Sequence, residues 1–235
     1  MKRTVSVGSR RIEYILIQSV RQGVLLQALP EGVTRVYAPK HMRLRDIDAL
    51  VVRNAEKISG MHDQLDRKLD EDHRAHPVTD GSRISIEGTA RILRLHQGRL
   101  RGEISESEFH LWLADPDSDA AVRTAVKRVL AERALEKIRE RIEFFHPKIG
   151  GEYGRVTVRD QRSRWGSCSS KHNLNFNWKL IMAPPQALDY VVIHELCHLH
   201  EFNHSQRFWK LVEAQMPEYE FWKKWLKNHG EELGV

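Results

Sequence analysis

Five consecutive residues near the C-terminus carry the clearest chemical pattern in the chain. The segment His194-Glu195-Leu196-Cys197-His198 has the form H-E-x-x-H. We expect it to lie in a helix, where residues i and i+4 share one face, so that both imidazoles can bind a single metal ion. Glu195 follows the first histidine and is placed to accept a proton from a water molecule held at the metal. The pattern therefore predicts a zinc site with Glu195 as the general base of a hydrolase.

The apolar residues around this pattern argue against a purely structural role for the two histidines. The core face of the helix is expected to consist of Leu188, Val191, Val192, Leu196, Leu199 and Phe202. Because these side chains suffice to bury the helix, the histidines are not needed for packing. In a chain of this length and composition, chance would produce only roughly 0.06 such patterns.

A catalytic zinc site needs a third protein ligand and an open coordination position. His204 is the leading candidate, because six residues after His198 the chain has room to turn and bring another imidazole to the metal. The alternative is a carboxylate from the helices that follow, namely Glu213, Glu218 or Glu220. His200 lies two residues beyond His198 and is expected to point away from the metal.

A basic segment precedes the metal-binding pattern. Residues 161–180 contain no acidic side chain and hold Arg162, Arg164, Lys171 and Lys179, interleaved with Trp165, Phe176 and Trp178. We interpret Trp165 and Trp178 as residues that pack against the catalytic helix. The candidate substrate-binding residues are Arg162, Arg164 and Lys171, which could neutralise a phosphate or a nucleic-acid strand.

The elements that must position these residues follow from periodicity and turn signals. In the first half we expect strands at 11–18, 24–28, 33–37, 84–86, 90–95 and 108–113, and one helix at 46–69. In the second half we expect helices from about 119 to 145, 185 to 200, 206 to 215 and 217 to 230, and strands at 155–159 and 173–180. No internal repeat is visible. These elements predict an α+β protein, with a β-rich N-terminal domain at 1–115 and a metallohydrolase domain at 116–235.

Composition limits the class of protein. The 235 residues carry 38 Lys and Arg against 32 Asp and Glu, a formal net charge of +6, which makes nucleic acid a possible partner. Two cysteines cannot form a disulfide scaffold or a four-cysteine zinc site. No apolar run approaches the ~20 residues that span a membrane, and no apolar segment of a signal peptide follows the basic N-terminus. We therefore expect a cytoplasmic protein that does not act in a membrane.

Several segments of the second half closely resemble the YgjP-like metallopeptidase family, which is similar to the SprT-like and WLM proteases. The resemblance covers roughly residues 155–230 and is carried by residues 163–168, 177–178, 180, 183–185, 189–198, 203–205 and 208–209. It implies a zincin-like fold for the C-terminal domain, zinc bound by His194, His198 and His204, and Glu195 as the general base. The sequence departs from the related metzincin pattern at Glu201, which stands where that pattern has glycine.

The sequence is compatible with three functions. The first is a zinc metallopeptidase that acts on a peptide or protein. The second is a nucleoside triphosphate pyrophosphatase, which some relatives are known for, with Arg162, Arg164 and Lys171 neutralising the phosphates. The third is a DNA-associated protease or DNA-binding module, although residues 1–115 contain no recognisable DNA-reading motif.

Overall fold

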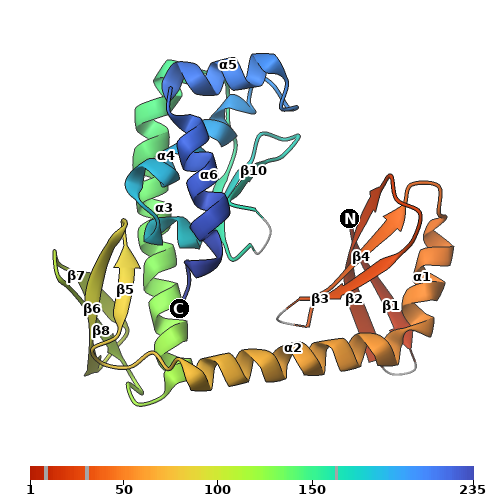
Figure 1. Ribbon diagram of the computed structural model, residues 1–235, viewed down its shortest axis with the longest axis horizontal. Coiled ribbons are helices and arrows are strands. Elements are labelled where there is room, and N and C mark those ends of the chain that lie inside the picture. Colours follow the sequence, from red (N-terminus) through yellow and green to blue (C-terminus); the bar gives the residue numbers. More distant parts are fainter. Residues whose placement is uncertain (8–9, 30–31, 162–163) are drawn as a thin grey trace. The chain divides into compact units, whose positions relative to one another are not determined.

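The computed structural model describes residues 1–7, 10–29, 32–161 and 164–235. The chain divides into two compact units, Met1–Pro77 and Val78–Val235. Both combine helices and strands, in keeping with the α+β class (Figure 1). The domain boundary expected near residue 115 falls inside the second unit. The reason is that the strands between residues 83 and 113 share one hydrophobic core with the long helix that follows them.

The first unit is a four-stranded sheet followed by two helices. Its strands are β1 (Lys2–Val7), β2 (Arg10–Ser19), β3 (Leu25–Ala28) and β4 (Thr34–Pro39), in the spatial order β1-β2-β4-β3. The hairpins β1–β2 and β3–β4 are antiparallel, and β2 and β4 join them as a parallel pair. Side chains alternate along the strands, and the inward set packs against the helices.

The single helix expected at 46–69 is in fact two helices, α1 (Leu44–Arg53) and α2 (Ala55–Ala75). Asn54 separates them. Its side-chain amide donates a hydrogen bond of 2.8 Å to the carbonyl oxygen of Leu50, and so occupies one of the acceptors at the end of α1. The helical periodicity continues across Asn54, so the sequence pattern did not reveal the break.

The second unit begins with a sheet of the same topology. Strands β5 (Arg83–Ile86), β6 (Thr89–Gln97), β7 (Arg101–Ile104) and β8 (Glu108–Leu113) have the order β5-β6-β8-β7. Again two antiparallel hairpins are joined by a parallel pair, here β6 and β8. The arrangement of four strands followed by a helix thus occurs twice, although no repeat is visible in the sequence.

The helix α3 (Asp119–Ile149) supports the rest of the second unit. Ser118 caps its first turn by accepting a hydrogen bond from the backbone N–H of Ala121. A small sheet follows, formed by β9 (Val156–Arg159), β10 (Gly166–Cys168) and β11 (Leu174–Asn177) in the order β10-β11-β9. The remaining elements are the 3-10 helices Trp178–Met182 and Gly230–Glu232 and the helices α4 (Pro185–Cys197), α5 (Gln206–Gln215) and α6 (Tyr219–His229).

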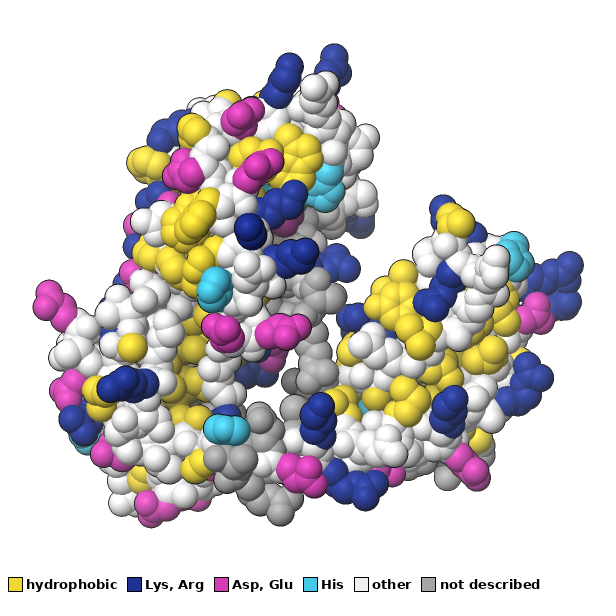
Figure 2. Space-filling view, viewed as in Figure 1, with side chains coloured by type: hydrophobic (Ala, Val, Ile, Leu, Met, Phe, Trp, Pro, Cys, Tyr) yellow, Lys and Arg dark blue, Asp and Glu magenta, His cyan; other side chains and the backbone are white. Residues whose placement is uncertain are grey.

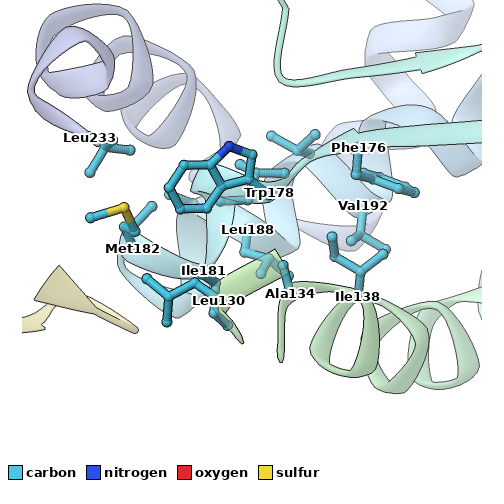
Figure 3. Close-up of a cluster of buried hydrophobic side chains, with 14 of the residues drawn as sticks. Leu130, Ala134, Ile138, Phe176, Trp178, Ile181, Met182, Leu188, Val192 and Leu233 are labelled. Atoms are coloured by element: carbon cyan, nitrogen blue, oxygen red, sulfur yellow. The ribbon is translucent and has the colours of Figure 1, made fainter. Parts of the chain in front are cut away.

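A continuous core holds α4 between its neighbours. Figure 3 shows Leu130, Ala134 and Ile138 of α3 close to Leu188 and Val192 of α4. Trp178, which is 3% exposed, belongs to the same core, so its predicted packing role is confirmed. The strand expected at 173–180 is shorter, because from Trp178 the chain forms the 3-10 helix instead. The helix expected to reach residue 200 ends at Cys197.

In the described part of the chain, no helix combines the length and apolar character needed to cross a membrane.

Candidate metal centre

Helix α4 places two imidazoles on one face of the helix. It begins with Pro185 in its first turn, where a missing backbone N–H costs nothing. Ile193 and Leu196 are fully buried and fix the rotation of the helix about its axis. The Nε2 atoms of His194 and His198 consequently lie 3.2 Å apart.

A third imidazole comes from the loop after α4. The Nε2 atom of His204 lies 3.0 Å from that of His194. Ser205 follows immediately and caps α5, accepting a hydrogen bond from the backbone N–H of Phe208. Among the described residues, His194, His198 and His204 form a group whose candidate ligand atoms all lie within 4.8 Å of one another. That group does not include the alternative ligands Glu213, Glu218 and Glu220.

Residues at and just after the end of α3 contact the segment that leads from α4 to His204. The ring Nε2 of His200 lies 2.9 Å from the carbonyl oxygen of Ile149, so the prediction that His200 points away is confirmed. Gly151 adopts a φ of +89°, and a Cβ atom there would lie 2.8 Å from the Cβ of Leu199. The close approach therefore requires glycine and fixes the chain as it leaves α4.

The donor set fits zinc. The Nδ1 atom of His198 lies 2.9 Å from the carbonyl oxygen of Glu201. Because a carbonyl only accepts hydrogen bonds, Nδ1 carries the proton and Nε2 of the neutral ring keeps its lone pair, as a metal ligand requires. Two nitrogens at about 2.0–2.1 Å from a tetrahedral zinc lie about 3.3 Å apart, close to the separations found between these Nε2 atoms.

The surroundings of the histidines keep them neutral. Burial, together with the charges of His198, His204 and Lys223, lowers the pKa of His194 to about 3. Burial also lowers the pKa of His198, against the opposing effect of its hydrogen bond to Glu201. Neutral imidazoles are the form that binds a metal, so the site does not require proton loss from these two rings near neutral pH.

Glu195 is buried beside the histidines. The residue is only 4% exposed, and its Oε2 atom has no hydrogen-bond partner among the described residues. Burial raises the pKa of its carboxyl to about 8, while the charge of Arg164 and the backbone N–H of Cys168 act in the opposite direction. A carboxyl held in this way can take up and release a proton near neutral pH, as a general base requires.

Strand β10 lies directly against Glu195. A Cβ atom at Gly166 would lie 2.6 Å from Oε1 of Glu195 and 2.7 Å from its Cγ. The carboxylate of Glu195 therefore occupies space that any side chain at position 166 would fill. Sequence reasoning missed both this residue and its strand, because three residues are too few to show a period of two. The glycine between Trp165 and Ser167 was the available signal.

Aromatic rings surround the histidines. Phe208 stacks on His198 with ring centres 4.5 Å apart, and Trp209 stacks on His204 at 5.6 Å. Tyr219 stacks in turn on Trp209 at 5.2 Å, and the Nζ of Lys223 lies 4.1 Å from the centre of the Trp209 ring. Phe208 is fully buried, whereas Trp209 is only partly buried and packs beside His204.

Of two further aromatic residues near the histidines, Phe202 differs from expectation. Phe202, expected in the core, is 55% exposed, because it follows the end of α4 and stacks on His172 of the β10–β11 turn at 5.5 Å. Tyr190 is buried one turn before His194, and their ring centres lie 5.8 Å apart. Burial, with the charges of Glu195 and Tyr219, raises the pKa of the Tyr190 hydroxyl.

The three basic residues expected to bind substrate have different positions. Arg164 is exposed, precedes β10 and lies close enough to Glu195 for its charge to act on that carboxyl. Lys171 lies in the turn between β10 and β11, and no described contact joins its side chain to the histidines. Arg162 lies outside the described residues.

Comparison with known proteins gives one result that covers most of the chain. The model of the family described as "YgjP-like, metallopeptidase domain" matches residues 24–229. No match was found among curated proteins.

Proposed function

The chain belongs to the YgjP-like metallopeptidase family, and from this premise we propose that it hydrolyses peptide bonds with a zinc ion held by His194, His198 and His204. The observation that carries this proposal is the convergence of three Nε2 atoms next to the buried carboxyl of Glu195. This is the combination of three ligands and a general base used by catalytic zinc sites. A cytoplasmic location is part of the proposal, and the unpaired Cys168 and Cys197 fit it.

Glu195 has the central chemical role in this proposal. Zinc, when bound, supplies a Lewis acid that polarises the substrate carbonyl and makes a water molecule more acidic. Glu195 accepts a proton from the attacking water as the oxygen of that water bonds to the carbonyl carbon. The same carboxyl then donates that proton to the amine nitrogen as the carbon–nitrogen bond breaks. Its unpartnered Oε2 is available to hold the proton between the two steps.

Tyr190 is a candidate for stabilising the negative charge on the carbonyl oxygen. It lies one helical turn before His194, on the same face of α4. Burial raises the pKa of its hydroxyl, so the group keeps its proton and remains a hydrogen-bond donor.

We assign β10 as the strand that aligns the substrate. β10 is at the edge of the described three-stranded sheet, with β11 on its other side. An edge strand offers backbone groups to an extended peptide, and the position of Gly166 beside Glu195 would bring that peptide next to the general base. Arg164 stands at the start of this strand and would meet an acidic part of the substrate.

A nucleoside triphosphate is the alternative substrate at the same centre. The observation in its favour is the exposed Arg164, which lies two residues before the Gly166 that borders Glu195, since a cation in that position could also neutralise phosphates. Incubation of the zinc-loaded protein with nucleoside triphosphates and, separately, with a mixture of peptides distinguishes the two. Release of pyrophosphate without peptide cleavage would contradict the peptidase proposal.

A further inference from the structure

The net positive charge of the chain is confined to its first 53 residues. This segment contains ten lysines and arginines and four acidic residues, a net charge of +6. The remaining residues carry 28 basic and 28 acidic side chains and are therefore neutral. The basic segment coincides with the sheet and first helix of the first unit, so the charge belongs to a folded surface.

One face of that sheet is not covered by the helices of its own unit. The inward side chains of β2 and β4, including Tyr14 and Val36, are buried against α1 and α2. Apart from Pro39 at the end of β4, the outward side chains are half-buried or exposed, and we call this surface the open face. Its members used below are Lys2, Arg11, Ile15, Ile17, Arg21, Leu25, Arg35 and Tyr37. Figure 2 shows hydrophobic side chains in this unit bordered by lysines and arginines.

The strand register places an aromatic ring and basic groups next to each other on the open face. Ile17, Tyr37 and Leu25 lie side by side across three strands, and Lys2, Ile15 and Arg35 form the neighbouring row. The Nη1 of Arg35 donates a hydrogen bond of 3.2 Å to the Tyr37 hydroxyl. The guanidinium carbon of Arg21 lies 5.7 Å from the centre of the same ring.

The arginines of the open face have no acidic partners within the described part of the unit. Arg3, on the opposite face, pairs with Asp48, whereas no described ion pair involves Lys2, Arg11, Arg21 or Arg35. The Nε atoms of Arg21 and Arg35 are buried without a hydrogen-bond partner. Among the described residues of β1–β4 whose side chains point toward the open face, Glu13 is the one acidic residue.

We propose that the open face binds single-stranded nucleic acid, independently of the metal centre. Unpaired arginines and lysine would contact phosphates, and an unpaired base would stack on Tyr37, with Ile15, Ile17 and Leu25 as its apolar surroundings. A sheet face bearing an aromatic ring and cations favours flexible single strands, whose bases are accessible, over a duplex whose bases are stacked inside. The activity of the metal centre has no part in this inference.

The test measures binding of a fluorescein-labelled 20-nucleotide oligo(dT) to the full chain by anisotropy at several salt concentrations. The Arg21→Ala/Arg35→Ala variant should bind at least 10-fold more weakly, and the slope of log K against log salt should shrink by about 1.4, since each lost contact to a single strand removes about 0.7. Lys224→Ala/Lys227→Ala, on exposed positions of α6, removes the same charge elsewhere and should change affinity less than threefold.

The role of the ring is tested separately. Tyr37→Phe keeps the stacking surface and should bind within twofold of the wild type, whereas Tyr37→Ala should bind about 5- to 150-fold more weakly. Circular dichroism of each variant verifies that the sheet is intact. The proposal is overturned by absent oligonucleotide binding at 50 mM salt, by equal losses in the two double variants, or by equal affinity for a 20-base-pair duplex. Binding to phosphatidylserine vesicles in place of the oligonucleotide would overturn it as well.

Discussion

Gly166 and Glu195 are packed so closely that the glycine defines the position of the carboxylate. A Cβ atom on Gly166 would lie 2.6 Å from Oε1 and 2.7 Å from Cγ of Glu195, far inside van der Waals contact. Both residues lie in well-packed surroundings, since α4 is buried and β10 is paired with β11. A side chain at position 166 would therefore have to displace the carboxylate.

The first prediction follows from this contact. Gly166→Ala should lower peptide hydrolysis roughly 100-fold, because displacement of a catalytic group by about 1 Å typically has that effect. Zinc binding should persist at one ion per chain, since the three histidines are untouched. Gly23→Ala is the matched control, because nothing lies within 4 Å of a Cβ there. Wild-type activity in Gly166→Ala would show that the contact does not position Glu195.

The second prediction concerns the third ligand. His204→Ala should weaken zinc binding by more than the roughly 10–100-fold that loss of an outer-shell hydrogen bond causes. Glu213→Gln should leave zinc affinity unchanged, because Glu213 is not part of the histidine group. Competition with a fluorescent chelator measures both affinities. The reverse ranking of these two variants would make the carboxylate the ligand and remove His204 from the site.

The third prediction concerns the attachment of α4 to α3. Arg141 donates two hydrogen bonds to Asp189, at 2.6 and 2.9 Å, and both side chains are largely buried. Arg141→Ala should lower the free energy of unfolding by about 2–3 kcal/mol, because it leaves a carboxylate without its charged partner. Burial already raises the pKa of Asp189 despite this arginine, so Arg141→Ala/Asp189→Asn should recover part of the loss.

Tryptophan fluorescence during urea unfolding measures this effect in the second unit alone, since all six tryptophans lie after residue 77. Arg139→Ala, on an exposed position of the same helix, should change the free energy of unfolding by less than about 0.5 kcal/mol. Equal effects of Arg139→Ala and Arg141→Ala would show that the ion pair between Arg141 and Asp189 does not stabilise the second unit.

The fourth prediction concerns pH and the first unit. The hydrogen bond from Arg3, with a further one from Tyr14, holds the pKa of Asp48 below its ordinary value of 3.8. A carboxyl whose pKa is lower in the folded state stabilises that state at higher pH, and this contribution is lost as the pH falls below about 4. Its size should be about 1 kcal/mol, because the pair is partly exposed to solvent.

Amide hydrogen exchange in β2 tests this effect by comparing the wild type with Asp48→Asn at each pH. Exchange in the variant should be faster at pH 6, and the difference should shrink progressively as the pH falls below about 4. A difference that grows as the pH falls would have the wrong sign for a lowered pKa.

The sequence predicted the grouping of the histidines better than it predicted the architecture. The convergence of His194 and His198 could be predicted because a fixed spacing on a helix leads directly to a shared face, whereas the role of Glu195 as general base stays a prediction. His204 could be placed only as the better of two options, since the path of a loop depends on contacts such as that of His200 with Ile149. Gly166 could not be found, because its role arises from a strand and a helix that are distant in the sequence.

The fold shows the same contrast between local and distant causes. Strands β2, β4 and β8 were predicted from their own apolar patterns. β1, β7 and β10 were missed, because they are polar or short and depend on their neighbours in the sheet. The boundary expected near residue 115 followed the change from strands to helix, whereas the structure divides the chain after Pro77, because strands β5–β8 share their core with α3.

The most direct test of the central claim is mass spectrometry of new termini in a complex peptide mixture treated with the zinc-loaded protein, with Glu195→Gln beside the wild type. We expect the wild type to cleave peptides and the variant to cleave none while holding the same amount of zinc. Equal cleavage by both proteins would contradict the assignment of Glu195 as the general base. Absence of cleavage by the zinc-loaded wild type would contradict the peptidase function itself.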